Sequence, residues 1–209
     1  MMTARKYPLE IRIHLIDGSV AAFYEDDADQ AKQIIGQIQP DRLFSQPSLL
    51  LAGISSVTVI PCTKVNMIEV IQDTYPNWPF MREVTDIVDC SPEAFRSGFL
   101  AFRDSLAARV QTPEVGDPFV SWGMMTLSGG QHFYFEARGI IRSVIEQRRL
   151  VHQVISAPCL ISRRREGGAV LVNPANIVSL ELSPGPRELP NTAWPMENKE
   201  AWRTGSSSD

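Results

Sequence analysis

The run RRRE, Arg163 to Glu166, is the stretch of this sequence whose residue types most readily suggest chemistry. It precedes Gly167-Gly168, which predicts the tip of a hairpin. Guanidinium groups bind phosphate through paired hydrogen bonds, and a hairpin tip can reach into a nucleic-acid groove. The alternative is an ordinary solvated loop. Five arginines are therefore candidate interaction residues: Arg163, Arg164 and Arg165 at the tip, with Arg138 and Arg142 on a helix predicted nearby.

Side chains that hold metals or act as nucleophiles are scattered. His14, His132 and His152 have no cysteine or carboxylate at metal-ligand spacing. The sequence contains no G-x-S-x-G turn, no H-E-x-x-H pair and no phosphate-cradling glycine loop. The acidic run Glu25 to Asp29 lacks the spacing of a calcium loop, and we expect it to cap a helix. We therefore predict no catalytic residue, metal site or cofactor, and a protein that is not an enzyme.

The three cysteines, Cys62, Cys90 and Cys159, are widely spaced in apolar surroundings. Such an odd set predicts reduced thiols in a reducing compartment. The N-terminal residues do not resemble a signal peptide, and no apolar run approaches the roughly 18 residues of a membrane span. We therefore expect a cytoplasmic protein with no membrane contact.

Two apolar stretches 112 positions apart indicate how these side chains would be positioned. The first is VIPCTKVNMIEV (59–70), and the second is LVNPANIVSLEL (171–182), a buried strand entered through an Asn-Pro turn. Without gaps, Ile68 aligns with Leu180 and Glu69 with Glu181. Leu15-x-x-Gly18 matches Leu127-x-x-Gly130 at the same spacing. We predict an internal duplication in which residues 9–72 and 117–183 superpose.

Each of the two units is expected to run strand, strand, helix, strand, strand. Residues 9–15 alternate strictly between apolar and polar side chains, as a half-buried strand does, and Asp17-Gly18 is a hairpin turn. In the second unit the helix is placed at 138–149, with Ile140, Ile141, Val144 and Ile145 on one face, and a strand at 151–161 follows.

The predicted fold class is α+β: two tandem ββαββ repeats of mainly antiparallel strands, joined by an amphipathic helix. In strand number and length each unit resembles the small half-open barrels of SH3-like and Sm-like proteins. Sm proteins place their helix before the first strand, and no Sm signature motif is present. The resemblance therefore carries over no functional residues.

Four segments follow from this interpretation. They are a first repeat at 1–72, a linker at 73–116, a second repeat at 117–183 and a Pro-rich tail at 184–209. The linker should hold a helix at about 92–110, with Ser91 as N-cap, Pro92 at the first helical position and Glu93 in the first turn. Its apolar stripe includes Phe95 and Phe99.

The tail carries Trp194-Pro195, which follows the second repeat much as Trp78-Pro79 follows the first. A tryptophan buries a large apolar area, so we predict that each Trp-Pro docks onto the β-rich unit before it or onto the neighbouring unit. The tail would then be ordered through about Trp202. The alternative is that Trp194 and Trp202 form an exposed peptide motif for another protein.

The net charge of −4 and the pI near 5.5 argue against a chain built mainly to neutralise phosphates. Residues 117–183 are nevertheless net positive, with 7 basic and 5 acidic side chains, whereas 73–116 hold 4 and 7. We expect a non-enzymatic interaction or assembly module whose partner is another protein or a second copy in an oligomer. The alternative is a nucleic-acid-binding or regulatory protein that uses the Arg163–Arg165 tip.

Overall fold

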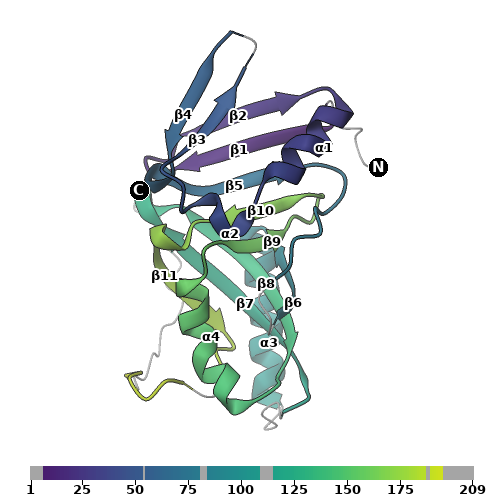
Figure 1. The fold of residues 1–209 in the computed structure, drawn as a ribbon. Coiled ribbons are helices and arrows are strands. Elements are labelled where there is room, and N and C mark those ends of the chain that lie inside the picture. Colours follow the sequence, from purple (N-terminus) through teal and green to yellow (C-terminus); the bar gives the residue numbers. More distant parts are fainter. Residues whose placement is uncertain (1–6, 54, 81–83, 109–114, 187–188, 195–209) are drawn as a thin grey trace, which may run out of the picture.

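The computed structural model describes residues 7–194 except 54, 81–83, 109–114 and 187–188 (Figure 1). Four α-helices and eleven strands occur in this part of the chain. The helices are α1 (Ala28–Gln37), α2 (Pro40–Leu43), α3 (Pro92–Ala108) and α4 (Val144–Ser156). The strands are β1 (Leu9–Leu15), β2 (Val20–Glu25), β3 (Ser48–Ala52), β4 (Val57–Pro61), β5 (Val65–Ile71), β6 (Val84–Asp89), β7 (Pro118–Leu127), β8 (His132–Ile140), β9 (Leu160–Arg163), β10 (Ala169–Val172) and β11 (Ile177–Ser183).

Nine of the strands form one mixed sheet in the order β11-β7-β8-β6-β9-β10-β5-β1-β2, and β3 and β4 form a separate two-stranded sheet. The pairings are antiparallel apart from that of β6 with β9. The predicted α+β class with mainly antiparallel strands is confirmed. The large sheet is open rather than closed into a barrel, because β2 and β11 lie at its two ends.

The strand pairs of residues 9–72, here the N-terminal segment, have counterparts in residues 117–183, the C-terminal segment. β1 pairs with β2 and β5, and β7 pairs with β8 and β11. Adding 112 to both partners of a β1·β5 pair gives a β7·β11 pair, so Ile13 opposite Ile68 corresponds to Met125 opposite Leu180. The register irregularity in the first ladder recurs at the corresponding place in the second. The β3·β4 and β9·β10 hairpins also correspond, with a spacing of 112 from β4 to β10 and of 111 from β3 to β9, so Leu50 opposite Val59 corresponds to Ile161 opposite Leu171.

Several predicted boundaries were wrong. The stretches 59–70 and 171–182 are each interrupted by a 3-10 turn, Cys62–Lys64 and Pro174–Asn176, so each segment holds five strands instead of four. A proline stands at each break, and its missing N–H cannot continue a ladder. The linker also contains β6, which the apolar pattern did not reveal.

The helix predicted at 138–149 was displaced as well. Residues 138–140 belong to β8, and α4 includes the VHQVIS stretch that was predicted as a strand. β8 lies inside the sheet, where Gly139 pairs with Phe119 of β7 and with Val84 of β6. Hydrogen bonding on both edges holds this stretch extended although its local pattern also suits a helix.

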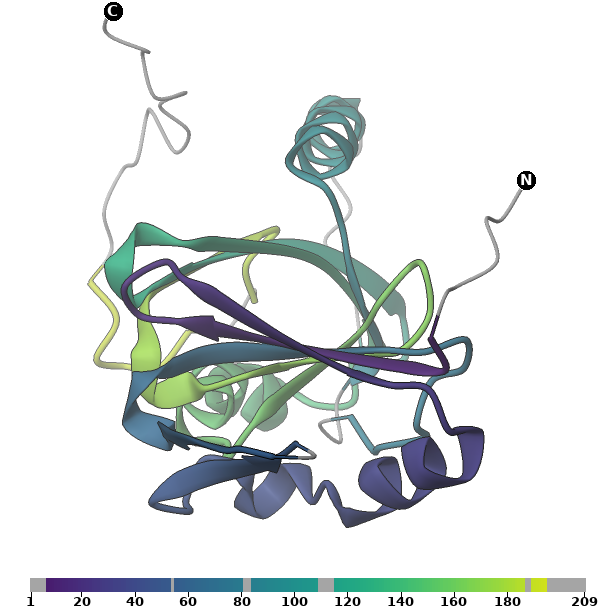
Figure 2. The ribbon, with the colours of Figure 1, turned by 90° about the horizontal axis from the view of Figure 1, so that it is seen from above.

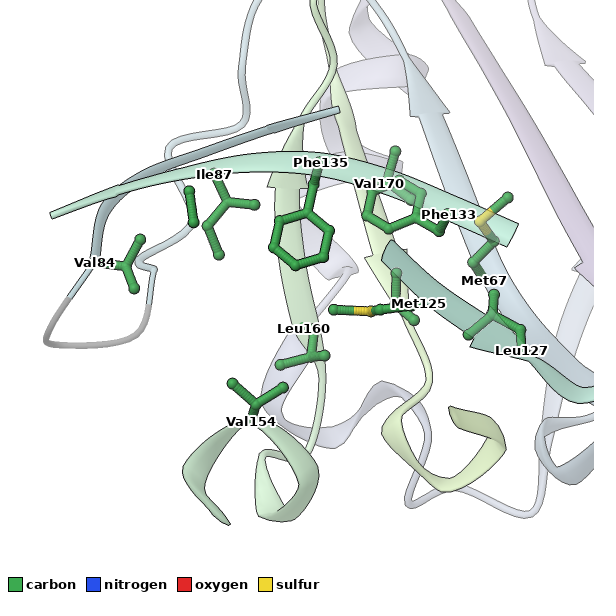
Figure 3. Packing of buried hydrophobic residues seen from close by; sticks show 12 residues of the cluster. Met67, Val84, Ile87, Met125, Leu127, Phe133, Phe135, Val154, Leu160 and Val170 are labelled. Atoms are coloured by element: carbon green, nitrogen blue, oxygen red, sulfur yellow. The ribbon is translucent and has the colours of Figure 1, made fainter. Parts of the chain in front are cut away.

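The sheet bends around two hydrophobic cores. The C-terminal core lies inside the curve of β7 and β8, where Phe135 and Met125 lie over Leu160, and Val154 of α4 lies below Leu160 (Figure 3). The N-terminal core lies between β1, β5, α1 and the β3–β4 hairpin. Figure 2 shows α3 on the opposite side of the sheet from α1 and α4.

Strand β10 belongs to both cores. All four of its residues are buried, and it pairs with β9 on one edge and with β5 on the other. Val170 and Val172 face the C-terminal core, whereas Leu171 faces the N-terminal core. This strand joins the two segments into one sheet.

The helix starts follow the predicted capping. The Asp27 side chain accepts from the backbone N–H groups of Asp29 and Gln30 at the start of α1. Ser91 Oγ accepts from the backbone N–H of Ala94 at the start of α3. In α3 the ring of Phe95 lies 5.1 Å from that of Tyr134 on β8, so this helix covers the outer face of the C-terminal segment.

Candidate interaction site

The basic tip forms where it was predicted, between β9 and β10. The backbone N–H of Arg164 donates to the carbonyl oxygen of Gly168 at 3.1 Å, and that of Gly167 donates back to Arg164 at 3.0 Å. Gly167 and Gly168 have positive φ, 96° and 86°. A Cβ atom at Gly168 would also overlap the carbonyl oxygen of Val70 on β5, so the tip is fitted closely against the neighbouring strand.

Arg163 is neither free to bind phosphate nor part of an ordinary solvated loop, because it makes a bidentate pair within the protein. Its guanidinium pairs with Asp86 of β6: Nε donates to Oδ1 at 2.8 Å, and Nη2 contacts Oδ2. A bidentate pair of this kind occupies the same donors that would grip a phosphate. The side chain is 44% exposed, so the pair remains in contact with water.

Arg164 is not an exposed tip residue. Its side chain is only 12% exposed, and Nε lies 3.7 Å from Oε2 of Glu69 while Nη2 lies 3.9 Å from Glu166. These distances describe ion pairs without a direct hydrogen bond, and Arg164 Nε and Glu69 Oε2 are both buried without a hydrogen-bond partner. The charge of Arg164 is therefore directed into the protein.

Arg165 is held by β6 and β8. Its backbone N–H donates to Asp89 Oδ1 at 2.8 Å, and its Nε donates to the Asp89 carbonyl oxygen at 2.9 Å. Its Nη2 lies 3.7 Å from Glu136, which also accepts from Nε of Arg138 at 2.5 Å. Arg142 is exposed beyond the end of β8. Four of the five candidate arginines thus have acidic partners, and Arg142 lies apart.

The acidic partners respond to this environment in opposite ways. Burial raises the pKa of Glu69, but the hydrogen bond from His14 and the charges of His14, Arg164 and Arg12 outweigh burial, and the net pKa is lowered. The pKa of Asp89 is raised, because burial outweighs the bond from Arg165 and the charges of Arg164 and Arg165. Glu69 is the carboxylate that the fold stabilises in its ionised form.

His14 links this cluster to the C-terminal segment. Nε2 of His14 lies 3.0 Å from Oε1 of Glu69, and Nδ1 lies 2.9 Å from Nε2 of Gln131. The amide nitrogen of Gln131 can only donate, so when the imidazole is neutral its hydrogen lies on Nε2, toward Glu69. Nearby, the Asn66 side chain donates to the carbonyl oxygen of Ser128 at 2.7 Å. With both ring nitrogens engaged, His14 acts here as a bridge between hairpins.

The cysteines lie inside the fold as free thiols. Burial raises the pKa of Cys90 to about 11, and it raises those of Cys62 and Cys159 as well. Each thiol is therefore protonated at neutral pH. Within the described part of the chain, no group of three His, Cys, Asp or Glu side chains comes together as a metal site.

The two Trp-Pro sites behave differently. Trp78 packs, partly buried, against the N-terminal core, as predicted. Trp194 is 88% exposed, so its predicted docking onto the C-terminal segment was wrong. The Ala193 N–H donates to the Pro190 carbonyl oxygen in the turn just before Trp194. Pro195 and Trp202 lie outside the described residues.

The β3–β4 hairpin is the surface that the sequence analysis did not single out. It stands away from the large sheet (Figure 1), and three of its apolar side chains are strongly exposed: Leu50 at 71%, Val57 at 64% and Val59 at 57%. The corresponding residues of the β9–β10 hairpin, Ile161, Ala169 and Leu171, are half-buried or fully buried. The hairpin thus presents to solvent the face that its counterpart packs inside the protein.

A signal for the missed acidic partners was present in the charge distribution. The linker is net acidic and residues 117–183 are net positive, so the two regions are complementary. The partners themselves, Asp86, Asp89 and Glu136, follow only from the strand order that places β6 between β8 and β9. For the exposed hairpin, the run SLLLA followed by VTVIP is apolar on both faces, which an isolated two-stranded sheet cannot bury.

The comparisons with known proteins add no relative. No family model, no curated protein and no solved structure matches this chain. Among the described helices, none is both long enough and apolar enough to span a membrane. The function is therefore inferred from the geometry of the chain alone.

Proposed function

We propose that this protein is a non-enzymatic interaction or assembly module of the cytoplasm, built on an internally duplicated β-rich scaffold. The observation that carries the proposal is the β3–β4 hairpin, with its exposed Leu50, Val57 and Val59. Apolar side chains gathered on a protruding hairpin mark a surface that another protein covers. A free strand edge beside them supplies backbone groups for pairing with a further strand.

The duplication is supported by two independent observations. The apolar residues of the two segments align at a spacing of 112 in the sequence, and their strand pairs correspond at the same spacing. Unrelated units with similar secondary structure would share the order of elements but have no reason to share register. A duplicated unit also gives an assembly module two related binding geometries on one chain.

The charged cluster supports a structural role for the arginine tip. Arg163, Arg164 and Arg165 face Asp86, Glu69 and Glu136, so a phosphate would have to displace carboxylates that already neutralise them. The nucleic-acid alternative would therefore rest on Arg142 and on the exposed parts of Arg163 and Arg165. We place it second for this reason.

A comparative capture experiment tests the interaction function. Tagged full-length protein is exposed to an extract of its source cells, in parallel with Leu50→Lys and with Val20→Lys as the matched control. Val20 is a 50% exposed valine on the edge strand β2, which does not pair with the hairpin in the described chain. We expect specific proteins, the chain itself included, to be lost with Leu50→Lys and retained with Val20→Lys. Identical captures by all three proteins would refute the proposal.

A further inference from the structure

We propose that the β3–β4 hairpin binds a second copy of this chain, by adding β4 to the free edge of β11 in the same geometry that joins β10 to β5 within one chain. This inference rests on the proposed assembly function and names the partner. The inference rests on a difference between the two hairpins: β10 of the β9–β10 hairpin pairs with β5, whereas β4 of the β3–β4 hairpin has no such neighbour among the described strands.

The β10·β5 ladder defines the expected register. Ala169 lies opposite Val70, and Leu171 lies opposite Ile68. Moving each residue to its counterpart at a spacing of 112 places Val57 opposite Leu182 and Val59 opposite Leu180. These partners belong to β4 and β11. Within the described residues, β4 pairs only with β3 and β11 only with β7, so both edges are free for this ladder.

Strand β11, the proposed acceptor, is less well covered than its counterpart β5. On β5, Val65, Ile68 and Val70 are 0%, 4% and 0% exposed, and they share the N-terminal core with Leu171 and Ile161 of the β9–β10 hairpin. Their counterparts on β11 are Ile177, Leu180 and Leu182, which pack against the C-terminal core but remain only partly buried. The C-terminal core therefore has an uncovered side at the place where the N-terminal core is closed by β10.

The β3–β4 hairpin carries the side chains that would cover the open side of the C-terminal core. In the β9–β10 hairpin, Leu171 and Ile161 reach across into the N-terminal core. Their counterparts are Val59 and Leu50, the exposed residues of the β3–β4 hairpin. In the proposed contact Val59 and Leu50 of one molecule enter the C-terminal core of the next, beside Leu180.

This contact joins unlike surfaces, since each chain offers one donor edge and one acceptor edge. Such head-to-tail contacts produce a closed ring when the rotation per subunit closes, and an open fibre when it does not. A dimer held by a single two-fold contact of β4 with β4 would instead leave β11 free. The two arrangements differ in which residues face each other.

Sedimentation of the purified full-length chain tests whether the hairpin mediates self-association. We expect assemblies larger than a dimer, and at least a tenfold weaker association for Val59→Lys, with Val20→Lys unchanged. Circular dichroism and thermal melts of each variant show whether it is folded. A chain that is monomeric at all concentrations, or one whose association is weakened by Val20→Lys and not by Val59→Lys, overturns the proposal.

Cross-linking tests the register. Carried on one chain, Val59→Cys and Leu180→Cys should give disulfide-linked ladders under oxidation, because opposed residues in an antiparallel pair lie about 4.5 to 5.5 Å apart at Cα. The matched control, Val57→Cys with Ser179→Cys, puts the thiols three residues out of register, about 10 Å apart, and should not link. Dimers formed by Val59→Cys alone would indicate the two-fold β4–β4 contact and overturn the head-to-tail arrangement.

The two proposals fail in different ways. If the purified chain does not self-associate while captured proteins still depend on Leu50, the interaction function stands and the second copy is not its partner. If self-association is absent and no captured protein depends on Leu50, both proposals are wrong.

Discussion

The β3–β4 and β9–β10 hairpins have corresponding strand pairs but occupy different surroundings. In one, Leu171 is fully buried at the centre of a nine-stranded sheet, whereas its counterpart Val59 in the other is 57% exposed. Both hairpins consist of strands of four or five residues, and the counterpart residues Leu50 and Ile161, and Val59 and Leu171, are apolar in both. The difference therefore comes from the neighbour that each hairpin finds: β5 receives β10, and nothing within the described chain receives β4. Local pattern decides that a hairpin forms, and the chain around it decides whether its face is covered.

The largest expected effect contrasts these two counterpart residues. Leu171→Ala should lower the free energy of unfolding by about 2 to 5 kcal/mol, since it leaves a cavity in a closed core. Val59→Ala should change it by no more than about 0.5 kcal/mol in the monomer, as exposed substitutions usually do. Urea unfolding at low protein concentration measures both. Equal losses at the two positions would mean that the hairpins are equally packed and would remove the contrast.

A second contrast lies within the turn of the β7–β8 hairpin, where Gly129 and Gly130 both have positive φ. A Cβ at Gly130 meets open space, but at Gly129 it would overlap the carbonyl oxygen of Ile16 in the N-terminal segment. Gly130→Ala should therefore cost about 1 to 2 kcal/mol, the strain of a left-handed residue. Gly129→Ala should cost about 1 to 3 kcal/mol more, because two hairpin tips must move apart. Thermal unfolding of the two variants separates these terms, and an equal loss would show that the tips are not in contact.

The Glu69 cluster gives a pH-dependent contrast between β5 and β11. The folded-state pKa of Glu69 lies below its ordinary value of 4.5, so its contribution to stability is complete above that pH and is lost as the pH falls through the folded pKa. Glu69→Gln should cost about 1 to 3 kcal/mol at pH 7, and the difference from the parent should shrink on acidification. Glu181→Gln, at the counterpart position on the edge strand β11, should cost less at pH 7. Denaturant titrations across pH check this, and a Glu69→Gln deficit that is constant with pH would contradict it.

The smallest expected effect concerns the tip itself. Arg163→Ala removes an ion pair that is partly exposed and should cost no more than about 1 kcal/mol. Arg164→Ala should cost more, because it removes the charge beside the buried oxygen of Glu69. Chemical denaturation of the two variants makes the comparison. If Arg163→Ala were the more harmful, Asp86 rather than Glu69 would be the carboxylate on which the tip depends.

Much of the local structure could be predicted from the sequence, because its causes are local. The alternation of residues 9–15, the Asp17-Gly18 turn and the capping by Asp27 and Ser91 depend on neighbours a few positions away. The boundary between β8 and α4 could not, since it depends on ladders to two other strands.

The environment of the arginine tip was unpredictable for a similar reason. Arg163 and Arg165 find partners on β6, 77 and 76 positions away, in a strand that the pattern did not reveal. The sequence around these arginines predicted the hairpin tip correctly, but it did not reveal the carboxylates that pair with them. The exposure of Trp194 could not be predicted either. A tryptophan-proline pair indicates how much apolar area could be buried, but it does not show whether an apolar surface of the protein lies close enough to bury it.

Strand β10 has a consequence for how the molecule comes apart. Since Val170 and Val172 of this strand belong to one core and Leu171 to the other, losing the strand would open the two cores at once. We therefore expect the two segments to unfold together. The slowest hydrogen exchange of the chain should occur at the amides of β5 and β10, and the neighbouring strands of both segments should be similarly protected. Unfolding by heat or denaturant should then be a single cooperative transition. The amide protons of the β3–β4 hairpin should exchange long before those of the other strands.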